Sequence, residues 1–529
     1  MDEIQKLVLE TIEKDKQTII FVPSRASAEK TAEDLSKKLN FYYPEFEKNV
    51  LQAASTPTKQ CRRLSHCIKK GVAFHHAGLL QKQKDLIEDE FKSGKIKVIC
   101  ATPTLAAGLS LPVFRVIIKS LKRFSGRWGM DWIPVLEYMQ MAGRAGRPEY
   151  EAFGEAICVA KNEIEKSEIY DRYICGEPEE IYSKLAAEPV LRTYLLSLIS
   201  SGIIRDEKTL NDFFANTFWA QQFKDMKKLQ DIIDRMLTML EDWKFIVVER
   251  NGKKKDKDND FISASSLVDS SSSSTSKKMR ATMLGKRISE LYLDPLTAKH
   301  LLDCLAKHEE INKINGNSNS NSKSSFSLLQ MISHTLEMRP LLRIKSKQQD
   351  TIQEELLNNY DFLLEKEPSA FDLEYNEFMN SIKTTLFFEA WIDEKNEDYL
   401  FEQYNISPGE IRVKLENADW LLYASEEISK ILEYRETIKD IRKLRVRIKN
   451  GVKEELLPLL KLKGVGRIRA RKLFANGIKT PMDVKRMDQS SIGQLLGKKI
   501  SEKVLTQLDV SIKQVSAGKR KGQMSLNKY

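Results

Sequence analysis

The chain has 529 residues, 41% of them hydrophobic and 30% charged, a balance typical of a protein that buries several cores. Its length predicts three or four domains. No apolar run is long enough to cross a bilayer, and Met1-Asp2-Glu3 lacks the basic start of a signal peptide. The six cysteines form no C-x-x-C pair, which predicts reduced thiols in a cytoplasmic protein and argues against zinc. We expect no membrane segment and no metal ligands in this chain.

The net charge of +11 is concentrated near the C-terminus. Residues 451–529 hold 18 Lys and Arg against 6 Asp and Glu, so this segment alone carries +12. The rest of the chain is close to neutral and is expected to carry basic patches. Such an excess of positive charge suits a nucleic-acid partner.

Residues 1–175 alternate short β-branched apolar runs with helical patterns, which is typical of a parallel α/β sheet. The predicted strands are Thr18–Val22, Gly71–Phe74, Val98–Ala101, Val116–Lys119 and Glu155–Val159. Binding residues of such sheets gather where strands end. His76 and Thr102 follow the second and third predicted strands, so we expect them at one edge of the sheet.

Residues 119–129 carry Gly and Ser turn signals between basic and aromatic side chains, which predicts a projecting β-hairpin. Lys122 and Arg123 are its candidate phosphate contacts, and Phe124 and Trp128 are its candidate stacking residues. On the residues alone, an ordinary surface hairpin fits equally.

Gln140–Pro148 follows Pro134, which can open a helix, and Pro148 stops it. On a helical path, Arg144 and Arg147 leave the same face. Gly143 and Gly146 allow another surface to approach the backbone. Two guanidiniums on a bare face suit a polyphosphate, although a solvated basic helix end has the same pattern.

The C-terminal two thirds are predicted to be mainly helical. Tyr182 to Ile199 forms one amphipathic stretch, and Phe245–Val248 reads as a strand. Two polar tracts, residues 253–278 and 312–324, are expected to be insertions. Pro408 and Gly409 open a helix that runs through Trp420 toward Tyr434.

Residues 459–473 have the pattern of a helix-hairpin-helix. Gly464 and Gly466 allow a tight turn whose N–H groups, with the next helix start, form an anion site. Arg467, Arg469 and Arg471 supply attraction to phosphates. Such a unit holds DNA without reading its bases.

Three of these stretches resemble, in order, motifs IVa, V and VI of Ski-type superfamily 2 helicases: Phe74–Leu79, Ala101–Pro112 and Gln140–Pro148. The likeness is strongest to archaeal Hjm-type DNA-repair helicases, relatives of the polymerase theta helicase region, and runs along nearly the whole chain. The sequence has no G-x-x-x-x-G-K-[ST] loop and no D-E-x-H-like motif. We therefore expect the first RecA-like domain to be absent.

The resemblance implies a multidomain α/β plus α fold. It places a second RecA-like domain at 1–175, a winged helix at 176–292, a helical ratchet domain at 293–450, a helix-hairpin-helix at 451–515 and a flexible tail at 516–529.

The resemblance also assigns roles. The arginines Arg144 and Arg147 become fingers on ATP, with Gln140 positioning water or phosphate. Gly108, Ser110 and Gly143 face the nucleotide, whose Mg²⁺ ligands are expected on the first domain. His76, Gly78 and Thr102 hold DNA phosphates, and the hairpin opens the duplex.

In the ratchet domain, the family aligns a basic residue and a tryptophan toward the DNA. Trp420 keeps the aromatic side chain, with a core aromatic as the alternative. Val413 stands at the basic position, so Arg412 or Lys414 is expected to substitute.

Gln523, Leu526 and Tyr529 resemble the peptide that binds the PCNA sliding clamp, with its second aromatic missing. A disordered basic end is the alternative.

Together these features predict part of an ATP-dependent 3′–5′ DNA helicase for fork repair and recombination, acting on single-stranded and forked DNA. It would need a first RecA-like domain in trans or on a fuller chain. A Ski-type RNA helicase part and a non-catalytic DNA junction-binding protein are the alternatives.

Overall fold

The computed structural model of the chain describes residues 2–54, 57–108, 111, 113–124, 129–146, 153–224, 226–249, 277–315 and 321–508. They form two compact units, which we treat separately. Unit 1 comprises residues 1–242, 246–280 and 397–414. Unit 2 comprises residues 243–245, 281–396 and 415–529.

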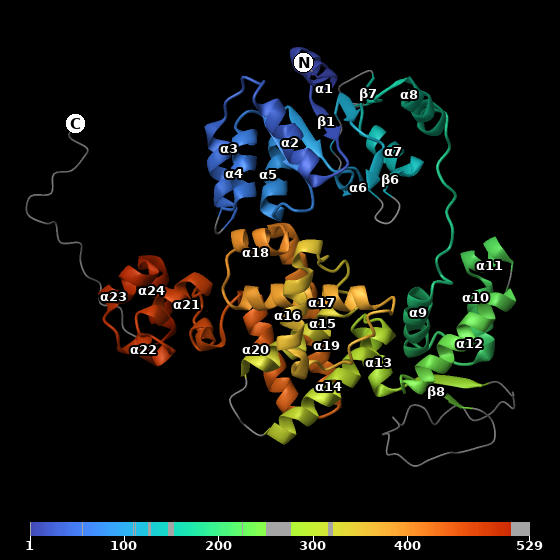
Figure 1. The fold of residues 1–529 in the computed structure, drawn as a ribbon, viewed down its shortest axis with the longest axis vertical. Helices are drawn as coiled ribbons and strands as arrows, with labels where there is room; N and C mark the ends of the chain where they lie inside the picture. Colours follow the sequence, from blue (N-terminus) through green and yellow to red (C-terminus); the bar gives the residue numbers. More distant parts are fainter. Residues whose placement is uncertain are drawn as a thin grey trace, which may run out of the picture. The chain divides into compact units, whose positions relative to one another are not determined.

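A five-stranded parallel sheet lies at the centre of the N-terminal half of unit 1 (Figure 1). Its strands are β1 (Thr18–Phe21), β2 (Val72–His75), β3 (Val98–Ala101), β4 (Arg115–Ile118) and β7 (Glu155–Cys158), in the order β2-β3-β1-β4-β7. All five predicted strands are confirmed to within one residue at each end. The expected α/β sheet is therefore present.

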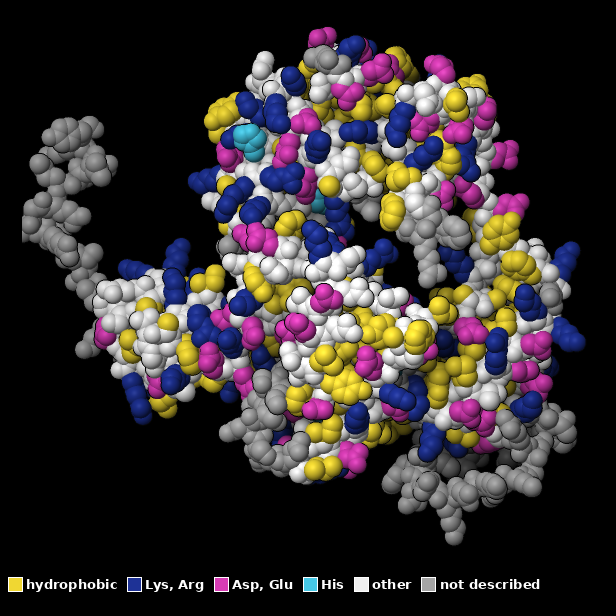
Figure 2. Space-filling view, viewed as in Figure 1, with side chains coloured by type: hydrophobic (Ala, Val, Ile, Leu, Met, Phe, Trp, Pro, Cys, Tyr) yellow, Lys and Arg dark blue, Asp and Glu magenta, His cyan; other side chains and the backbone are white. Residues whose placement is uncertain are grey.

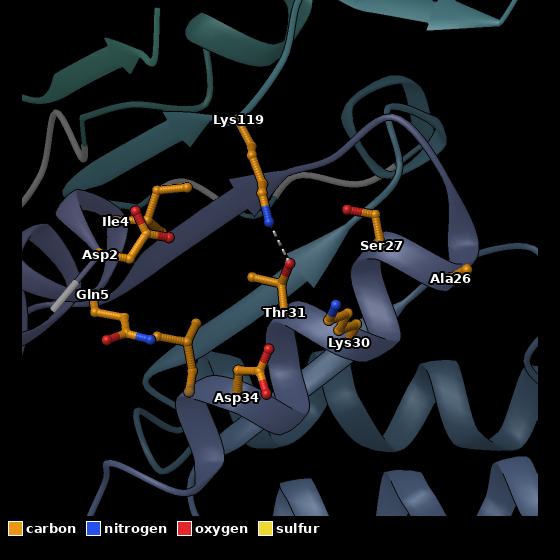
Figure 3. A pocket seen from close by; sticks show the side chains of 10 residues that line it. Asp2, Ile4, Gln5, Ala26, Ser27, Lys30, Thr31, Asp34 and Lys119 are labelled. Atoms are coloured by element: carbon orange, nitrogen blue, oxygen red, sulfur yellow. Dashed lines mark hydrogen bonds between the residues drawn. The ribbon is translucent and has the colours of Figure 1, made fainter. Parts of the chain in front are cut away.

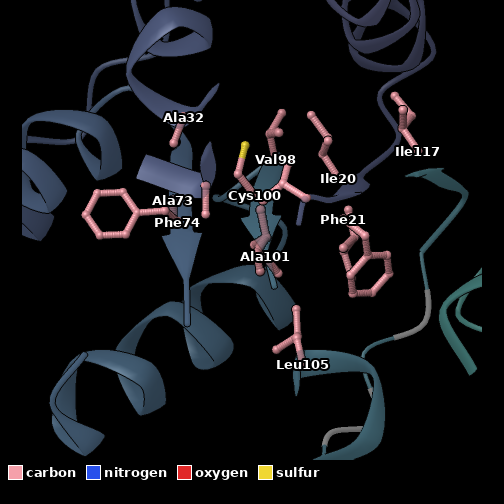
Figure 4. Packing of buried hydrophobic residues seen from close by; sticks show 14 of the residues in the cluster. Ile20, Phe21, Ala32, Ala73, Phe74, Val98, Cys100, Ala101, Leu105 and Ile117 are labelled. Carbon is pink, nitrogen blue, oxygen red and sulfur yellow. The ribbon is translucent and has the colours of Figure 1, made fainter. Parts of the chain in front are cut away.

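Helices cover the sheet because the segments between its strands carry apolar residues at helical spacing, and these residues pack against the sheet. They are α1 (Glu3–Glu13), α2 (Arg25–Ser36), α3 (Pro44–Gln52), α4 (Lys59–Ile68), α5 (Gln81–Lys92), α6 (Thr104–Gly108), α7 (Val135–Ala142) and α8 (Glu163–Ile169), the last continued by a π-helical turn η1 (Tyr170–Ile174). Figure 4 shows the packing at the sheet, where Ile20, Phe21, Phe74 and Ile117 are almost fully buried. Burying each such side chain contributes about 1.5–3 kcal/mol.

The predicted hairpin is also confirmed. Strand β5 (Lys122–Phe124) pairs antiparallel with β6 (Met130–Trp132), so that Phe124 lies opposite Met130.

The remainder of unit 1 is mostly helical, with one correction to the predicted elements. It contains α9 (Glu188–Ser200), α10 (Glu207–Ala215), α11 (Phe218–Phe223), α12 (Met226–Asp242) and α18 (Glu397–Tyr404). The single helical stretch predicted from Tyr182 is wrong, because α9 starts only at Glu188. Pro189 lies in the first turn of α9, where its missing N–H costs no hydrogen bond; in a helix that began at Tyr182 it would lie in the interior and break one.

Strands β8 (Ile246–Glu249) and β9 (Lys278–Ala281) form a two-stranded sheet. The predicted strand at 245–248 is thus confirmed with a shift of one residue. Nearly all of the polar tract 253–278 lies outside the described residues, although its last residue, Lys278, belongs to β9. A winged helix in this region stays a prediction.

Unit 2 is helical throughout its described residues, as predicted. Its main helices are α13 (Met283–Glu290), α14 (Pro295–Asn315), α15 (Asn321–Ser333), α16 (Gln349–Asn358), α17 (Tyr375–Ile392) and α20 (Arg435–Asn450). The polar tract expected at 312–324 is shorter than predicted, since α14 continues to Asn315 and α15 begins at Asn321. Helix α19 (Pro408–Ile431) opens at Pro408 as expected and has its first seven residues in unit 1.

Residues 451–508, which we call the terminal module, have a core of their own. They form two short 3₁₀ turns, η5 (Glu454–Leu456) and η6 (Leu459–Lys461), and the helices α21 (Arg467–Ala475), α22 (Pro481–Arg486), α23 (Gln489–Leu496) and α24 (Lys498–Gln507). Leu456, Leu473, Ile492 and Val504 are completely buried in this core. The helix expected before Gly464 is replaced by the turns η5 and η6, so the helix-hairpin-helix stays a prediction.

One buried acid in α17 makes stability depend on pH. Burial, followed by the charges of Asp393 and Glu355, raises the pKa of Glu389 from 4.5 to about 7. The folded chain therefore keeps this proton up to about pH 7, whereas the unfolded chain loses it near pH 4.5. The contribution of the Glu389 carboxyl to the free energy of unfolding therefore falls as the pH rises from about 4.5 to about 7.

Glu389→Gln should raise the free energy of unfolding of unit 2 by about 1–3 kcal/mol at pH 8 and leave it unchanged at pH 4. Urea titrations at the two pH values measure this difference. Asp361→Asn, which removes an exposed carboxyl, is the control and should show no such pH dependence. Equal effects of Glu389→Gln at both pH values would contradict the assignment.

Candidate functional site

The loops after β2 and β3 lie together, as the sequence predicts. His75 and Ala101 are paired at the ends of these strands. Thr102 donates its N–H to the His75 carbonyl at 3.2 Å, and its hydroxyl lies 2.9 Å from that of Thr104. Thr102 is half-buried, so its side chain remains within reach of a ligand at this edge.

His76 is completely buried. Its ring stacks on Phe74 with centroids 5.5 Å apart, accepts the Gly78 N–H at 3.1 Å and lies 3.2 Å from a Glu29 carboxylate oxygen. A direct phosphate contact by the His76 ring is therefore not supported, since the ring would have to leave this packing. Its observed role is to hold the loop that contains Gly78.

The Gly78 loop contacts the first turn of α19 through backbone atoms. Gly409 donates its N–H to the Gly78 carbonyl at 3.1 Å. A Cβ atom on Gly409 would lie 2.4 Å from the Ala77 carbonyl oxygen, and one on Gly78 would lie 2.8 Å from the Ser407 hydroxyl. Glycine at both positions makes this close approach possible.

Ion pairs attach the same segment to the sheet domain. Arg25 pairs with Glu410 at 2.6 Å, and Lys59 pairs with Glu402 at 2.5 Å. The Ser407 hydroxyl also donates to Glu410, at 2.7 Å. Sequence analysis missed this attachment, because the partners lie more than 300 positions apart and no local pattern links them.

Farther along α19, the predicted ratchet residues differ in exposure. Arg412 is exposed, whereas Lys414 is buried, and burial lowers the pKa of Lys414 to about 8. Arg412 is thus the better candidate for a phosphate contact. Trp420 is half-buried, and its indole N–H donates to the Leu291 carbonyl at 3.1 Å. This position leaves both the structural and the DNA-facing interpretation open.

Residues 143–146, which include the first arginine of the predicted pair, are not helical. Helix α7 ends at Ala142 because the chain then pairs with Val113, whose N–H donates to the Arg144 carbonyl at 2.9 Å. Gly146 in turn donates to the Val113 carbonyl at 2.7 Å and has a φ of +97°. Arg144 therefore lies outside a helix, and because Arg147 is not among the described residues, a shared face of the two arginines stays a prediction.

Arg144 is nevertheless brought against α6, the helix that ends at Gly108. Its guanidinium is half-buried, and Nε donates to the Ala106 carbonyl at 3.1 Å. Gln140 and Gly143 are exposed nearby in sequence. The structure thus joins two of the predicted nucleotide-binding stretches, although Arg147 and Ser110 lie outside the described residues.

An acid from a distant segment fixes the start of α7. The Glu179 carboxylate accepts the N–H groups of Val135 at 2.6 Å and Leu136 at 3.1 Å. These backbone hydrogen bonds lower the pKa of Glu179. Sequence analysis missed this cap because Pro134 stands at the position where a local capping side chain would be sought.

The basic side chains at the base of the hairpin have protein partners, whereas the described residues next to its turn are exposed. Lys122 lies 3.9 Å from the centre of the Trp132 ring and 3.5 Å from Glu165, and Arg123 pairs with Glu137 at 2.8 Å. Phe124 is 67% exposed and is paired across the hairpin with the exposed Met130. Phe124 is thus available for stacking, whereas the two cations have protein partners; Trp128 lies outside the described residues.

In the terminal module, two of the three predicted arginines contact the end of α17 and the turn that follows it. Arg467 stacks over Trp391 at 5.2 Å, and Arg471 pairs with Glu394 at 2.5 Å. The Glu394 and Glu455 carboxylates raise the pKa of Arg471. Arg469 is exposed and donates to the Gly464 carbonyl at 3.1 Å. Gly464 has a φ of +91°, as a tight turn requires, and Gly466 precedes the first residue of α21.

A cavity of about 410 Å³ that the sequence did not predict lies near the ends of β1 and β4, and Figure 3 shows the side chains that line it. Lys30, Asp34 and Lys119 line it, and Lys119 donates to the Thr31 hydroxyl at 3.1 Å. The order of the strands reverses between β1 and β4, which is where such sheets form crevices. Its mixed charges single out no ligand.

In the part of the chain that the structure describes, no His, Cys, Asp and Glu side chains are grouped as metal ligands. Within the same residues, no helix is long and apolar enough to span a membrane. The predicted clamp-binding residues Gln523, Leu526 and Tyr529 lie outside the described residues, so that peptide stays a prediction.

Comparison with known proteins agrees with this geometry. Residues 1–149 match a helicase conserved C-terminal domain, and residues 326–451 match domain 4 of archaeal helicases. An ATP-dependent DNA helicase Hel308 of Methanocella arvoryzae is 36% identical over 519 residues, which cover 96% of this chain and 65% of the relative. Hel308 of Pyrococcus abyssi is 36% identical over 529 residues, which cover 98% of this chain and 67% of that protein. The chain belongs to the Hel308 family.

The chain spans about two thirds of the length of these Hel308 relatives. The match to the C-terminal helicase domain covers the sheet from β1 to β4 and helix α7, and so includes Thr102 and Arg144. The match to archaeal domain 4 covers most of α15 and all of α16–α20. The resemblance to archaeal superfamily 2 helicases is thereby confirmed.

Gly409→Ala should destabilise unit 1 by about 1–3 kcal/mol, because the added methyl group would meet backbone atoms of the Gly78 loop that cannot easily move. Urea unfolding followed by tryptophan fluorescence measures the change. Gly493→Ala is the matched control. Gly493 lies in α23, where alanine favours the helix, and its added methyl group would make only an ordinary van der Waals contact with the Ser501 hydroxyl. Unchanged stability of Gly409→Ala would refute the close contact.

Proposed function

We propose that the chain is the C-terminal part of an ATP-dependent DNA helicase that unwinds duplex DNA with 3′ to 5′ polarity during replication-fork repair and recombination. The observation that carries this proposal is the position of Arg144. Backbone pairing with Val113 places it against α6, in the same domain as the Thr102 edge. The names of the Hel308 relatives, ATP-dependent DNA helicases, support the assignment.

The residues of this chain fit one side of a nucleotide site. Arg144 and Arg147 would neutralise phosphate charge, Gln140 would orient water or phosphate, and Gly108 and Ser110 would line the site. When bound, ATP with Mg²⁺ supplies the free energy of phosphate-bond hydrolysis. The phosphate loop and the Mg²⁺ ligands would come from a first RecA-like domain, in trans or on a fuller chain.

The DNA-facing residues fall into three groups with different tasks. Thr102 and the Gly78 loop would hold the loaded strand at the edge of the sheet. Phe124, together with Trp128, would stack on the terminal base pair and separate the strands. Arg412 and Trp420 on α19 would contact the strand as it passes. Because α19 begins on the Gly78 loop, movement of the sheet domain would carry the start of α19 with it.

The isolated chain should show no DNA-stimulated ATP hydrolysis, and adding a cognate first RecA-like domain should restore it. Arg147→Ala should reduce the restored rate by roughly 10³–10⁵-fold, the range known for arginine fingers. A coupled phosphate-release assay measures the rate. Arg235→Ala, which removes an exposed arginine from α12, is the control. Robust ATP hydrolysis by the chain alone would refute the proposal that the nucleotide site is shared with a first RecA-like domain.

Phe124→Ala should leave DNA binding and ATP hydrolysis of the reconstituted enzyme intact and slow unwinding of forked DNA roughly 5- to 100-fold, because one stacked base is worth about 1–3 kcal/mol. A strand-displacement assay run beside the ATPase assay separates the two effects. Phe371→Ala removes a ring from unit 2 that is even more exposed, 97% against 67% for Phe124, and should have no effect. If both variants unwind at the wild-type rate, the hairpin does not separate strands.

A further inference from the structure

The hairpin and the segment that carries Arg144 are consecutive in the chain. Strand β6 ends at Trp132, and α7 begins three residues later, at Val135. Helix α7 has eight residues and is followed by the short stretch that contains Arg144. A movement of Arg144 can therefore reach the hairpin through α7, provided that both ends of this helix are held.

The end of α7 is held by the contacts of Arg144 itself. The Val113 N–H donates to the Arg144 carbonyl at 2.9 Å, and Arg144 Nε donates to the Ala106 carbonyl at 3.1 Å. These hydrogen bonds do not involve the start of the helix. The arginine therefore keeps its position against α6 even if the start of α7 is released.

The start of α7 is held by Tyr173, a buried residue of the π-helical turn η1. Its hydroxyl donates to the Ile133 carbonyl at 2.6 Å. Its ring centroid lies 5.3 Å from that of Tyr138 in α7 and 5.9 Å from that of Trp132 in β6. Burial raises the pKa of Tyr173 to about 12, so the hydroxyl keeps the proton that it donates. Tyr173 thus contacts the hairpin and the helix at once.

Glu179 makes a second contact with the start of α7. Its carboxylate accepts the first two N–H groups of the helix, at 2.6 and 3.1 Å. Two residues later the chain is attached again, because the Gln222 side chain of α11 donates to the Ile181 carbonyl at 2.9 Å. Glu179 is exposed, but it lies between two attached points, Tyr173 and Ile181. Its carboxylate is therefore kept beside the helix start.

Ion pairs connect the base of the hairpin to the same elements. Arg123 of β5 pairs with Glu137, in the first turn of α7, at 2.8 Å. Lys122 lies 3.5 Å from Glu165 of α8. Figure 2 shows acidic and basic side chains interspersed over the visible face of the sheet domain. Strand β5 is therefore connected to α7 and α8 by ion pairs, and β6 is connected to α7 by the contacts of Tyr173.

We propose that Tyr173 and Glu179 are positioning residues for strand separation, because they hold the hairpin and the start of α7 together as one rigid element. When Arg144 moves during the nucleotide cycle, α7 then displaces the hairpin with it. Short π-helical turns such as η1 are frequent at functional sites, which fits this role. The inference rests on the proposed function and adds residues beyond the matched C-terminal helicase domain, which ends at residue 149.

Loss of these contacts should uncouple ATP hydrolysis from unwinding. Arg144 would stay in place through its own hydrogen bonds, so hydrolysis would continue, whereas the hairpin would no longer follow the helix. A variant that merely loosened the fold would lower hydrolysis and unwinding together. The number of base pairs separated per ATP hydrolysed therefore distinguishes positioning from general stability.

The test compares variants of the full chain mixed with a cognate first RecA-like domain. Tyr173→Phe with Glu179→Gln should lower the number of base pairs separated per ATP about 5- to 50-fold, because each lost hydrogen bond contributes up to about tenfold to an equilibrium. The kcat and the KM for ATP should stay within about twofold of the unmutated enzyme. Tyr170→Phe with Glu180→Gln is the matched control, since it makes the same changes at exposed neighbouring side chains, and should alter none of these quantities.

Amide hydrogen exchange of the chain alone tests the contact without the first domain. Glu179→Gln should speed exchange of the Val135 and Leu136 N–H groups roughly 3- to 10-fold, because they lose a charged acceptor. Glu180→Gln should leave their exchange unchanged, since its carboxylate accepts the Tyr182 hydroxyl instead.

Three results would overturn the inference alone. The first is equal exchange in the Glu179→Gln and Glu180→Gln variants, and the second is unwinding per ATP equal to that of the control. The third is a fall of ATP hydrolysis that matches the fall of unwinding, which would indicate a merely structural role. An unmutated enzyme that hydrolyses no ATP would instead overturn the proposed function, and this inference with it.

Discussion

The parallel pairing of β1 with β3 on one side and β4 on the other is the constraint on which the candidate site depends. Its register aligns Phe21 with Ala101 and with Ile118, so these strands end at the same edge. The loops that follow β2, β3 and β4 are thereby brought to this edge. Because every residue of β1, β2, β3 and β4 is buried, a slip of one residue would disrupt the packing on both faces of the sheet, and the apolar core therefore also fixes the position of the site.

The sequence was informative wherever local patterns decide the structure. Each strand of the sheet is a short apolar run bounded by helical segments, and the hairpin carries its own turn signals, so both were predictable. The end of α7 was not, because it is set by hydrogen bonds to Val113, about thirty positions away. The burial of His76 was hidden for the same reason, since its partner Glu29 lies in another helix. Residues such as Thr102 were placed correctly because strand ends are a local feature.

Basic residues in this chain have two distinct uses, which composition cannot separate. Lys122, Arg123 and Arg471 hold elements together through acids on neighbouring segments. Among the residues that the structure describes, Lys498 and Lys499 form no such pair. The charge of a segment therefore indicates the class of partner that it binds. The ion pairs within the chain determine which basic side chains are available to contact that partner. A surface ion pair is worth at most about 1 kcal/mol, so a phosphate is able to compete for the engaged cations as well.

The contact between Gly78 and Gly409 ties two distant positions of the chain to a single requirement. A side chain on Gly409 would meet backbone atoms of the Gly78 loop, and one on Gly78 would meet the Ser407 hydroxyl and the His76 ring. Neither position is free to vary while the other keeps its place, and a larger residue at one cannot be balanced by a smaller one at the other. The start of α19 and the loop after β2 are therefore under one steric constraint, so that a substitution in either is felt by both, although more than 300 residues separate them.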